Sequence, residues 1–443
     1  MKLPVPPPPW LSLFERHAGQ IPAILGHGIR AEVRGVYEHW DHLRHLTPPQ
    51  GLDVEQWWLG IKLARQSLCK ALPLHDKSGK PFHVCPSDGI QRQLFQVARD
   101  AAGALQGAGE LPSGVMQERY LVRSLIEEAM TSSQLEGAAT TTQVAKDMLR
   151  SGRAPRDYGE RMIVNNFRTM RELKRWLGQP LTPDIVFEIH RMLTDGTLKD
   201  PAAAGRLRRA DENIFVEDET GTTLHVPPSA RELPRRMQAL CDFANQNDES
   251  DFFIHPVVRA ITIHFMIGYD HPFVDGNGRT ARALFYWSML RAGFWMTEYF
   301  SISSILKQAP AQYTRAYLYT ESDDGDASYF VAHQLGVLLK AIDGVHAYID
   351  RKQQAHAQAQ TLLRPGSALA RRLNHRQRAL LLNALRNPGK AYTIAVHQRT
   401  HDIAYDTARS DLVGLVDARL MRRDKQGKAH VFVARPDLAE KLR

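Results

Sequence analysis

The chain has 443 residues, of which 43% are hydrophobic and 24% are charged, the balance of a folded globular protein long enough for two or three domains. It has no apolar stretch long enough for a membrane span, and its proline-rich start lacks the apolar core of a signal peptide, so we expect a cytoplasmic protein. The three cysteines, Cys69, Cys85 and Cys241, are far apart and have no CxxC spacing, which argues against a disulfide framework or a zinc site.

The net charge of +9 is concentrated at one end of the chain. Residues 364–443 carry 17 Lys and Arg against 7 Asp and Glu, whereas the preceding residues carry nearly equal numbers of the two signs. The basic excess therefore belongs to the C-terminal segment and is not a diffuse nucleic-acid signal.

Residues 1–115 form the first predicted domain. Apolar residues recur at helical spacing over 54–71 and 90–104, and a stretch with Pro and Gly over 75–89 separates the two runs. We therefore expect a helical N-terminal region, in which Trp40, Trp57 and Trp58 are packing residues. This region contains no recognisable catalytic motif.

Residues 116–362 form the second predicted domain, which is mostly helical. Apolar periodicity predicts several helices, over 121–130, 165–177, 183–193, 255–269 and 279–292. Between residues 205 and 228 the pattern changes to two short β-prone runs, 213–216 and 223–226, joined by the turn-forming residues 218–221. The expected fold class is therefore mainly α, a helical bundle with one β-hairpin.

The loop between the last two of these helices, HPFVDGNGRTAR, concentrates groups suited to phosphate chemistry. His271 can accept a proton near neutral pH, and Asp275 offers the oxygen ligand that Mg²⁺ prefers when it also holds substrate phosphates. The glycines allow the backbone N–H groups around Asn277 to form an anion-binding nest at the start of a helix. Arg279 and Arg282 lie three residues apart on that helix and can clamp a polyphosphate. The string predicts a nucleotide site.

At every specified position this string matches the signature HxFx(D/E)GNGRxxR, and the chain resembles Fic-domain proteins. Most active members of that family transfer AMP from ATP to a hydroxyl side chain of a target protein. The resemblance implies that His271 deprotonates the attacking hydroxyl and that Asp275 holds Mg²⁺. It also implies a set of nucleotide-binding residues, namely Gly276, Asn277, Gly278, Arg279, Arg282 and, as an adenine contact, Tyr313.

The upstream run TSSQLEGAATT carries a second element of the resemblance. Its Ser132, Glu136 and Gly137 match the family's inhibitory motif (S/T)xxxE(G/N), on a helix expected around 121–137. The resemblance implies that Glu136 pairs with Arg282 and excludes a properly placed γ-phosphate. ATP then binds with its α-phosphorus misaligned for attack, and such misplacement costs about 100-fold or more in rate.

The hairpin between residues 205 and 228 resembles the family flap, which lies over the active site and holds a target segment by strand addition. Gly205 and Arg208 resemble its start, and Pro227 and Pro228 its end. The tip, EDETGTT, is longer and more acidic than in the simplest versions, which leaves the target preference open.

Residues 363–443 resemble a winged-helix domain. A helix over 375–386 precedes two helices, 393–400 and 405–416, joined by a tight turn, and a hairpin around DKQGK follows as the wing. If this domain binds DNA, the expected contacts are Tyr405, Arg409 and Ser410 in the major groove and Arg422, Arg423, Lys425 and Lys428 on phosphates. The helix residues that would oppose phosphates are Asp406, Asp411 and Asp417. Contact with a protein is the alternative.

Two classes of function follow from these patterns. The first is an autoinhibited protein adenylyltransferase that uses ATP and Mg²⁺ to modify a Ser, Thr or Tyr hydroxyl of a target protein or of itself. The second is a DNA-binding transcriptional regulator with a vestigial nucleotide site. Within the enzyme class, transfer of another nucleotidyl group and removal of AMP with Glu136 aligning a water stay open. A homo-oligomer is compatible with either class.

Overall fold

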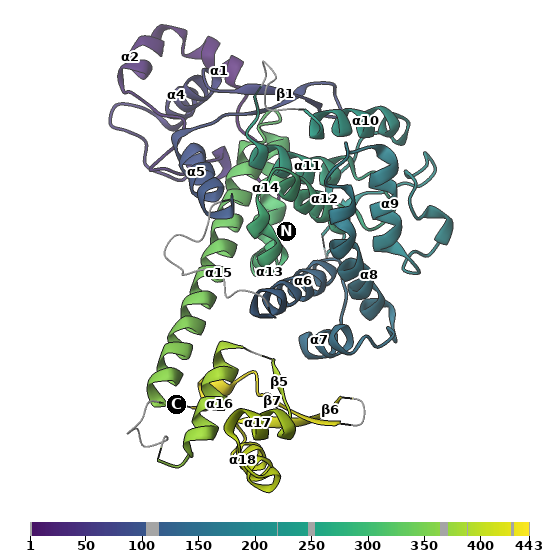
Figure 1. Ribbon diagram of the computed structural model, residues 1–443. Helices are drawn as coiled ribbons and strands as arrows, with labels where there is room; N and C mark the ends of the chain where they lie inside the picture. Colours follow the sequence, from purple (N-terminus) through teal and green to yellow (C-terminus); the bar gives the residue numbers. More distant parts are fainter. Residues whose placement is uncertain are drawn as a thin grey trace. The chain divides into compact units, whose positions relative to one another are not determined.

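The computed structural model describes most of the chain, namely residues 2–102, 115–218, 220–246, 253–363, 371–387, 389–426 and 429–442. The described residues are mainly helical, as predicted, with a few short strands (Figure 1). They form one compact unit of residues 1–103 and 123–342 and another of residues 104–122 and 343–443. Among the described helices, none has the length and apolarity needed to cross a membrane.

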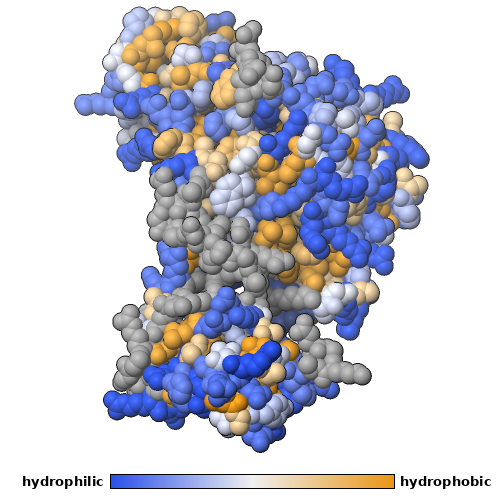
Figure 2. Space-filling model, viewed as in Figure 1, coloured by the Kyte–Doolittle hydropathy of each residue, from blue (hydrophilic) through white to orange (hydrophobic). Residues whose placement is uncertain are grey.

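The N-terminal region is helical, as expected. Its helices are α1 (Trp10–Arg16), α2 (Ile21–Gly26), α3 (Trp40–Leu43), α4 (Val54–Gln66) and α5 (Asp88–Ala102). The three tryptophans named above are buried in one apolar cluster between these helices, so the packing interpretation is confirmed. Figure 2 shows apolar residues gathered over α1 and α2, where Leu11 and Leu25 are more than half exposed.

A β-hairpin replaces the end of the helix predicted over 54–71 and part of the predicted loop. Helix α4 ends at Gln66, and β1 (Lys70–His75) pairs antiparallel with β2 (Pro81–Val84). The pairing of Lys70 with Val84 places Cys69 directly opposite Cys85, and the two form a disulfide. The expectation of no disulfide was therefore wrong, because strand register brings together cysteines that sequence spacing separates. Cys241 is free and buried.

Buried polar contacts join the N-terminal region to the segment after residue 320. The Lys62 ammonium lies 2.8 Å from the Asp323 carboxylate, and Arg65 Nη1 donates to the Tyr329 hydroxyl at 2.7 Å. The backbone N–H of Cys85 donates to Ser328 Oγ at 2.8 Å. Since unpaired charges are costly to bury, these contacts fix the N-terminal helices on the remainder of the first unit.

The central bundle is built from ten helices of the described chain: α6 (Val115–Leu135), α7 (Thr142–Ser151), α8 (Tyr158–Glu172), α9 (Pro183–Thr194), α10 (Leu233–Ala244), α11 (Pro256–Asp270), α12 (Asn277–Arg291), α13 (Ile302–Leu306), α14 (Pro310–Ser322) and α15 (Ser328–Leu362). Helix α9 starts with Pro183 at its first position and is capped by Thr182. Helices α11 and α12 pack against each other and are buried almost throughout (Figure 1). They form the core of the bundle and present the loop between them.

The predicted hairpin is present but short. Strand β3 (Val216–Glu217) pairs with β4 (Thr223–His225), and the Gly221 N–H donates to the Asp218 carbonyl at 3.0 Å to close the turn. Glu219 of the acidic tip lies outside the described residues. The hairpin stands at the expected place between α9 and α10.

The second unit contains the predicted helices and hairpin in the predicted order, together with a strand and a short helix that were not predicted. These are α16 (His375–Arg386), β5 (Ala391–Tyr392), α17 (Ile394–His401), α18 (Tyr405–Asp417), β6 (Met421–Gln426), β7 (Ala429–Ala434) and the short α19 (Leu438–Lys441). The strands form an antiparallel sheet in the order β5-β7-β6. Leucines from α16 and α18 pack on this sheet in one apolar cluster.

One residue of α18 has a different role from the one predicted. Asp411 is 4% exposed, and its carboxylate accepts hydrogen bonds from Arg376 Nε at 2.7 Å and from the Asn374 amide at 2.6 Å. It also lies 3.1 Å from His397 Nε2. The prediction that Asp411 opposes phosphates was wrong, because this carboxylate points inward and holds α16, α17 and α18 together. Lys428, a predicted wing contact, lies outside the described residues.

Candidate active site

The loop after α11 begins with His271 in a left-handed backbone conformation. Its φ is 44°, which is uncommon for a residue other than glycine. His271 Nδ1 lies 3.3 Å from the carbonyl oxygen of Gly268. Burial lowers the pKa of His271 to about 4, so the ring is neutral at physiological pH. A neutral imidazole can accept a proton.

Asn277 and Gly276 shape the middle of the loop. The Asn277 side chain both accepts from the Phe273 N–H at 2.9 Å and donates to the Phe273 carbonyl at 2.8 Å. Gly276 precedes the first residue of α12 with a φ of 83°, a conformation that favours glycine. The Asn277 side chain therefore braces the loop, and only its backbone is free to contact a phosphate.

Asp275 and Arg279 lie together on one side of this loop. The Asp275 side chain is 44% exposed, and its Oδ1 accepts from the Gly276 N–H at 2.5 Å and lies 3.6 Å from Arg279 Nη2. Arg279 is fully buried and donates from Nη1 to the carbonyl of Leu193 at 3.0 Å. Its Nε and Nη2 make no hydrogen bond with the described residues. The site thus offers an accessible carboxylate beside a guanidinium with unused donors.

Arg282 is held by the end of α6. Its Nε donates to Ser132 Oγ at 2.8 Å, and its Nη2 donates to the Ser132 carbonyl at 3.0 Å and to Glu136 Oε1 at 2.8 Å. Gly137, with a φ of 93°, ends the helix and turns Glu136 toward the loop. Burial raises the pKa of Glu136, but the Arg282 guanidinium outweighs this effect and holds that pKa below its usual value. The pair is therefore ionic at neutral pH.

A cavity of about 200 Å³ lies between this pair, the loop and the hairpin. The predicted site residues that line it are Glu136, His271, Asn277, Gly278, Arg282 and Tyr313. Val216 and Leu224 of the hairpin form another wall, so the hairpin covers the site as expected of a flap. Five predicted residues lie outside this lining: Ser132, Gly137, Asp275, Gly276 and Arg279. The cavity is smaller than the roughly 300–1,000 Å³ of typical ligand sites.

One residue that we did not predict, His190, joins the loop to the base of the hairpin. His190 Nδ1 accepts from the Gly205 N–H at 2.9 Å, so its Nε2 donates to the Asp275 carbonyl, 2.9 Å away. The His190 ring also stacks on Phe273 with centroids 3.8 Å apart. Burial lowers the pKa of His190 to about 4, which keeps this neutral tautomer. His190 occupies an ordinary position on an amphipathic helix, and no sequence signal distinguishes it.

Two further residues, Arg208 and His225, anchor the hairpin. Arg208, which was assigned to the start of the flap, donates from Nε to the His271 carbonyl at 2.9 Å and from Nη2 to the Pro228 carbonyl at 2.5 Å. His225 Nε2 lies 2.7 Å from the Tyr269 carbonyl, and its Nδ1 lies 2.7 Å from Glu321 Oε2. The catalytic loop and both ends of the hairpin are thus one hydrogen-bonded assembly. His225 was not predicted.

Comparison with known proteins agrees with this geometry. Residues 180–289 match the model of the Fic/DOC family. The Protein adenylyltransferase Fic of Nematostella vectensis is 30% identical over 191 residues, which are 42% of this chain and 42% of that protein. Protein adenylyltransferase fic-1 of Caenorhabditis elegans is 29% identical over 184 residues, which are 41% of this chain and 34% of that protein. A crystal structure of a Fic family protein from Desulfovibrio desulfuricans G20 matches with a TM-score of 0.49 and 17% identity, covering 78% of this chain and 96% of that chain.

The matched segment runs from the start of α9 into α12 and contains the hairpin and the whole catalytic loop. Residues 180–289 therefore match the Fic/DOC family, and the resemblance seen in the motif is confirmed. Its curated relatives are named as protein adenylyltransferases. The chain spans less than half the length of these relatives.

Proposed function

We propose that the chain is a protein adenylyltransferase that transfers AMP from ATP to a Ser, Thr or Tyr hydroxyl and is held inactive by Glu136. The observation that carries this proposal is the pairing of Arg282 with Ser132 and Glu136 directly beside the Fic loop. A nucleotide site that lacked activity would have no need of a partly buried acid that occupies its phosphate-binding arginine. The family match and the names of the relatives support the same reaction.

The chain's own groups have the following roles in AMP transfer. A target hydroxyl presented beside β3 and β4 loses its proton to the neutral imidazole of His271 as its oxygen attacks the α-phosphorus. The bond from the α-phosphorus to the β-phosphate oxygen breaks, and pyrophosphate leaves. The backbone N–H groups at the start of α12 and the guanidinium groups of Arg279 and Arg282 stabilise the negative charge on the phosphates.

Asp275 is the residue that would hold Mg²⁺ in this site. Its carboxylate is accessible, and Mg²⁺ typically takes one or two protein carboxylates together with substrate phosphates. The unused donors of the neighbouring Arg279 also fit a bound anion. When bound, the ion would neutralise charge on the phosphate oxygens.

Release of inhibition requires Glu136 to leave Arg282. With the pair intact, the cavity of about 200 Å³ is too small for a triphosphate in a productive position. Removing the carboxylate both enlarges the cavity and frees the guanidinium for the γ-phosphate.

Incubation of the purified protein with labelled ATP and Mg²⁺ tests the proposal. Wild type should incorporate little label, Glu136→Gly should label itself or added target proteins strongly, and the double variant Glu136→Gly/His271→Ala should not. The matched control is Glu127→Gln, which removes a carboxylate of α6 that does not line the cavity. Equal labelling by all variants would reject the assignment.

A second candidate function concerns residues 371–443, for which we propose binding to duplex DNA. The inward position of Asp411 supports it, since one of the three acidic charges expected to oppose phosphates is neutralised internally. Tyr405, Arg409 and Ser410 stay exposed on α18. Retention of the full chain on duplex DNA should fall with rising salt and weaken in Arg409→Ala. No retention at low salt would leave a protein partner as the alternative.

A further inference from the structure

A second cavity lies on the other side of helix α14 from the catalytic cavity. Its volume is about 390 Å³, within the range of small-ligand sites. Gln312, Arg315 and Tyr319 line this cavity, whereas Tyr313 and Tyr317 of the same helix line the catalytic one. At 3.6 residues per turn these two sets lie on opposite faces of α14. The second cavity is therefore a separate site.

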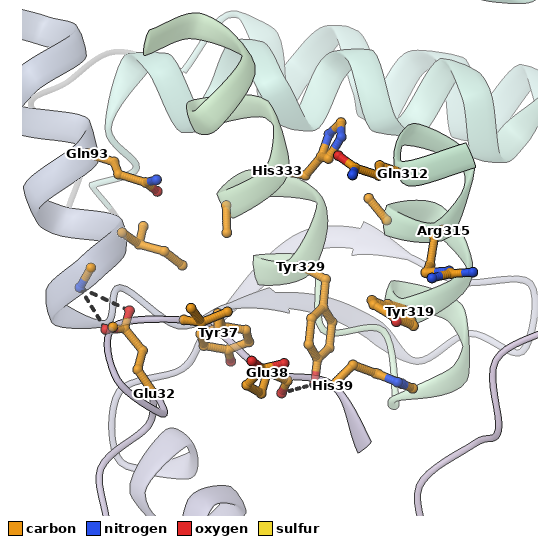
Figure 3. Close-up of a pocket in the computed structure, with 16 residues that line it drawn as sticks. Glu32, Tyr37, Glu38, His39, Gln93, Gln312, Arg315, Tyr319, Tyr329 and His333 are labelled. Carbon is orange, nitrogen blue, oxygen red and sulfur yellow. Dashed lines mark hydrogen bonds between the residues drawn. The ribbon is translucent and has the colours of Figure 1, made fainter. Parts of the chain in front are cut away.

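One side of this cavity is an aromatic surface (Figure 3). The rings of Tyr37 and Tyr329 meet edge to face with centroids 5.2 Å apart, and Tyr319 stacks on His39 at 4.1 Å. The Tyr37 hydroxyl donates to Asp326 at 2.7 Å, and the Tyr329 hydroxyl participates in the ion-pair cluster of Asp323 described above. The Tyr37 and Tyr329 hydroxyls are thus hydrogen-bonded inside the protein, and these contacts fix the two rings. Such a surface suits a flat, apolar ring.

The opposite side carries hydrogen-bonding groups. Figure 3 shows Gln93, His333 and Gln312 across the cavity from the tyrosines. His333 Nδ1 is buried and makes no hydrogen bond with the described residues. Burial also lowers the pKa of His333 to about 4, so the ring is neutral. A buried polar atom without a partner is costly, and a ligand with a complementary edge would remove that cost.

Charged groups complete the lining. Glu32 already accepts hydrogen bonds from Ser87 and from the Gly89 N–H. The Glu38 carboxylate lies 2.7 Å from His42 Nδ1 and is still 12% exposed. The Arg315 side chain belongs to an exposed residue at the edge of the cavity, as Figure 3 shows. The Glu38 carboxylate and the Arg315 guanidinium are therefore available to a ligand that has both hydroxyl and anionic parts.

We propose that this cavity binds a purine nucleoside monophosphate. The base lies against Tyr37, Tyr329 and Tyr319, and its edge meets the side-chain amides of Gln93 and Gln312, which pair well with adenine. Glu38 accepts from the ribose hydroxyls, as carboxylates do in other nucleotide sites. Arg315 binds the phosphate. The inference does not depend on AMP transfer at the catalytic loop.

Photolabelling of the full chain with 8-azido-AMP locates the bound nucleotide. We expect label within residues 35–44, which include Tyr37 and Glu38. Added AMP should prevent this labelling, and inorganic phosphate should not. Label at the catalytic cavity would instead lie within the hairpin, residues 210–231, or at Tyr313, the expected adenine contact, so binding at the two cavities is distinguishable. Label confined to the hairpin or to Tyr313, or none at all, would overturn the proposal.

Two variants test the proposed contacts. Arg315→Ala should weaken AMP binding at this cavity about tenfold or more while leaving adenosine binding unchanged, because it removes one charge-assisted contact to phosphate. Arg231→Ala removes an exposed arginine that lines neither cavity and is the matched control. Equal loss of AMP and adenosine binding in Arg315→Ala would contradict the phosphate role.

Ala332→Leu fills part of this cavity with a larger side chain. Label within residues 35–44 should disappear in this variant, whereas label within the hairpin should stay the same. An unchanged melting temperature would show that the variant is folded. If a folded Ala332→Leu protein labels residues 35–44 as wild type does, the cavity is not the binding site.

Discussion

The carboxylate of Glu136 lies directly against Gly278, so that a Cβ atom at position 278 would overlap with Oε1. Gly278 has an ordinary helical conformation, and its lack of a side chain matters here for space rather than for backbone freedom. The same surface of α12 is where the phosphates of a nucleotide would approach the helix N-terminus. A triphosphate bound as proposed would therefore compete with Glu136 for one place.

Ser132 should contribute to inhibition through Arg282. Ser132→Ala removes the hydrogen bond to Arg282 Nε, a charge-assisted contact worth about 1.5 kcal/mol or more. We expect AMP incorporation to rise about tenfold above wild type and to stay below that of Glu136→Gly. The control is Ser133→Ala, whose hydroxyl donates to the Ala129 carbonyl instead. A rise of equal size in both variants would indicate general loosening of α6.

The pH dependence of the Glu136→Gly variant, in which Arg282 is no longer paired with Glu136, should reflect the buried environment of His271. Its base form is the neutral imidazole, and a pKa of about 4 keeps that form dominant down to weakly acidic pH. Removing Glu136 deletes a negative charge that raises this pKa, so the variant titrates no higher. We predict that kcat/KM of Glu136→Gly is flat from about pH 8 to pH 5 and falls only near pH 4. An inflection close to the ordinary histidine pKa would contradict the assignment.

Asp275 should be needed for activity and dispensable for folding. In the Glu136→Gly background, Asp275→Ala and removal of Mg²⁺ by a chelator should each lower AMP incorporation by about 100-fold or more, because charge on the phosphates is no longer neutralised. The carboxylate is accessible, so the thermal unfolding midpoint should change little. Full activity of Asp275→Ala would exclude it as the metal ligand.

Glu128 should stabilise the position of α6, the helix that leads to Glu136. This carboxylate is 1% exposed and accepts hydrogen bonds from Tyr286, Ser301 and the Ser303 N–H and hydroxyl. Glu128→Ala leaves these donors unsatisfied and should lower the free energy of unfolding by about 3 kcal/mol. Tyr286→Phe removes one of these donors and should cost about 1 kcal/mol. Urea unfolding measures both, and equal values would show that the carboxylate is not the centre of the network.

The residues of the catalytic loop were predictable because they are contiguous in sequence. His271, Asp275 and Arg282 lie within twelve residues, and the spacing of glycines and arginines specifies a turn followed by a helix. The pairing of Glu136 with Arg282 joins residues 146 positions apart, and only resemblance to a known family indicated it. The hairpin followed from local signals, namely two short β-prone runs joined by the turn-forming residues 218–221.

The parts that were not predicted depend on tertiary contacts. Strand register brings Cys69 to Cys85, and apolar spacing in the short β1 and β2 does not reveal that register. His190 and His225 join elements whose neighbours are set only by the packed bundle. Asp411 was placed on the surface by helical position, yet its partners come from two other helices.

Intact-mass analysis after expression in a bacterial host tests the central claim most directly. The account predicts that Glu136→Gly protein, or a host protein co-purified with it, gains the mass of AMP, while wild type and Glu136→Gly/His271→Ala do not. A Glu136→Gly protein that is folded and supplied with ATP and Mg²⁺ but acquires no more AMP than wild type would contradict it.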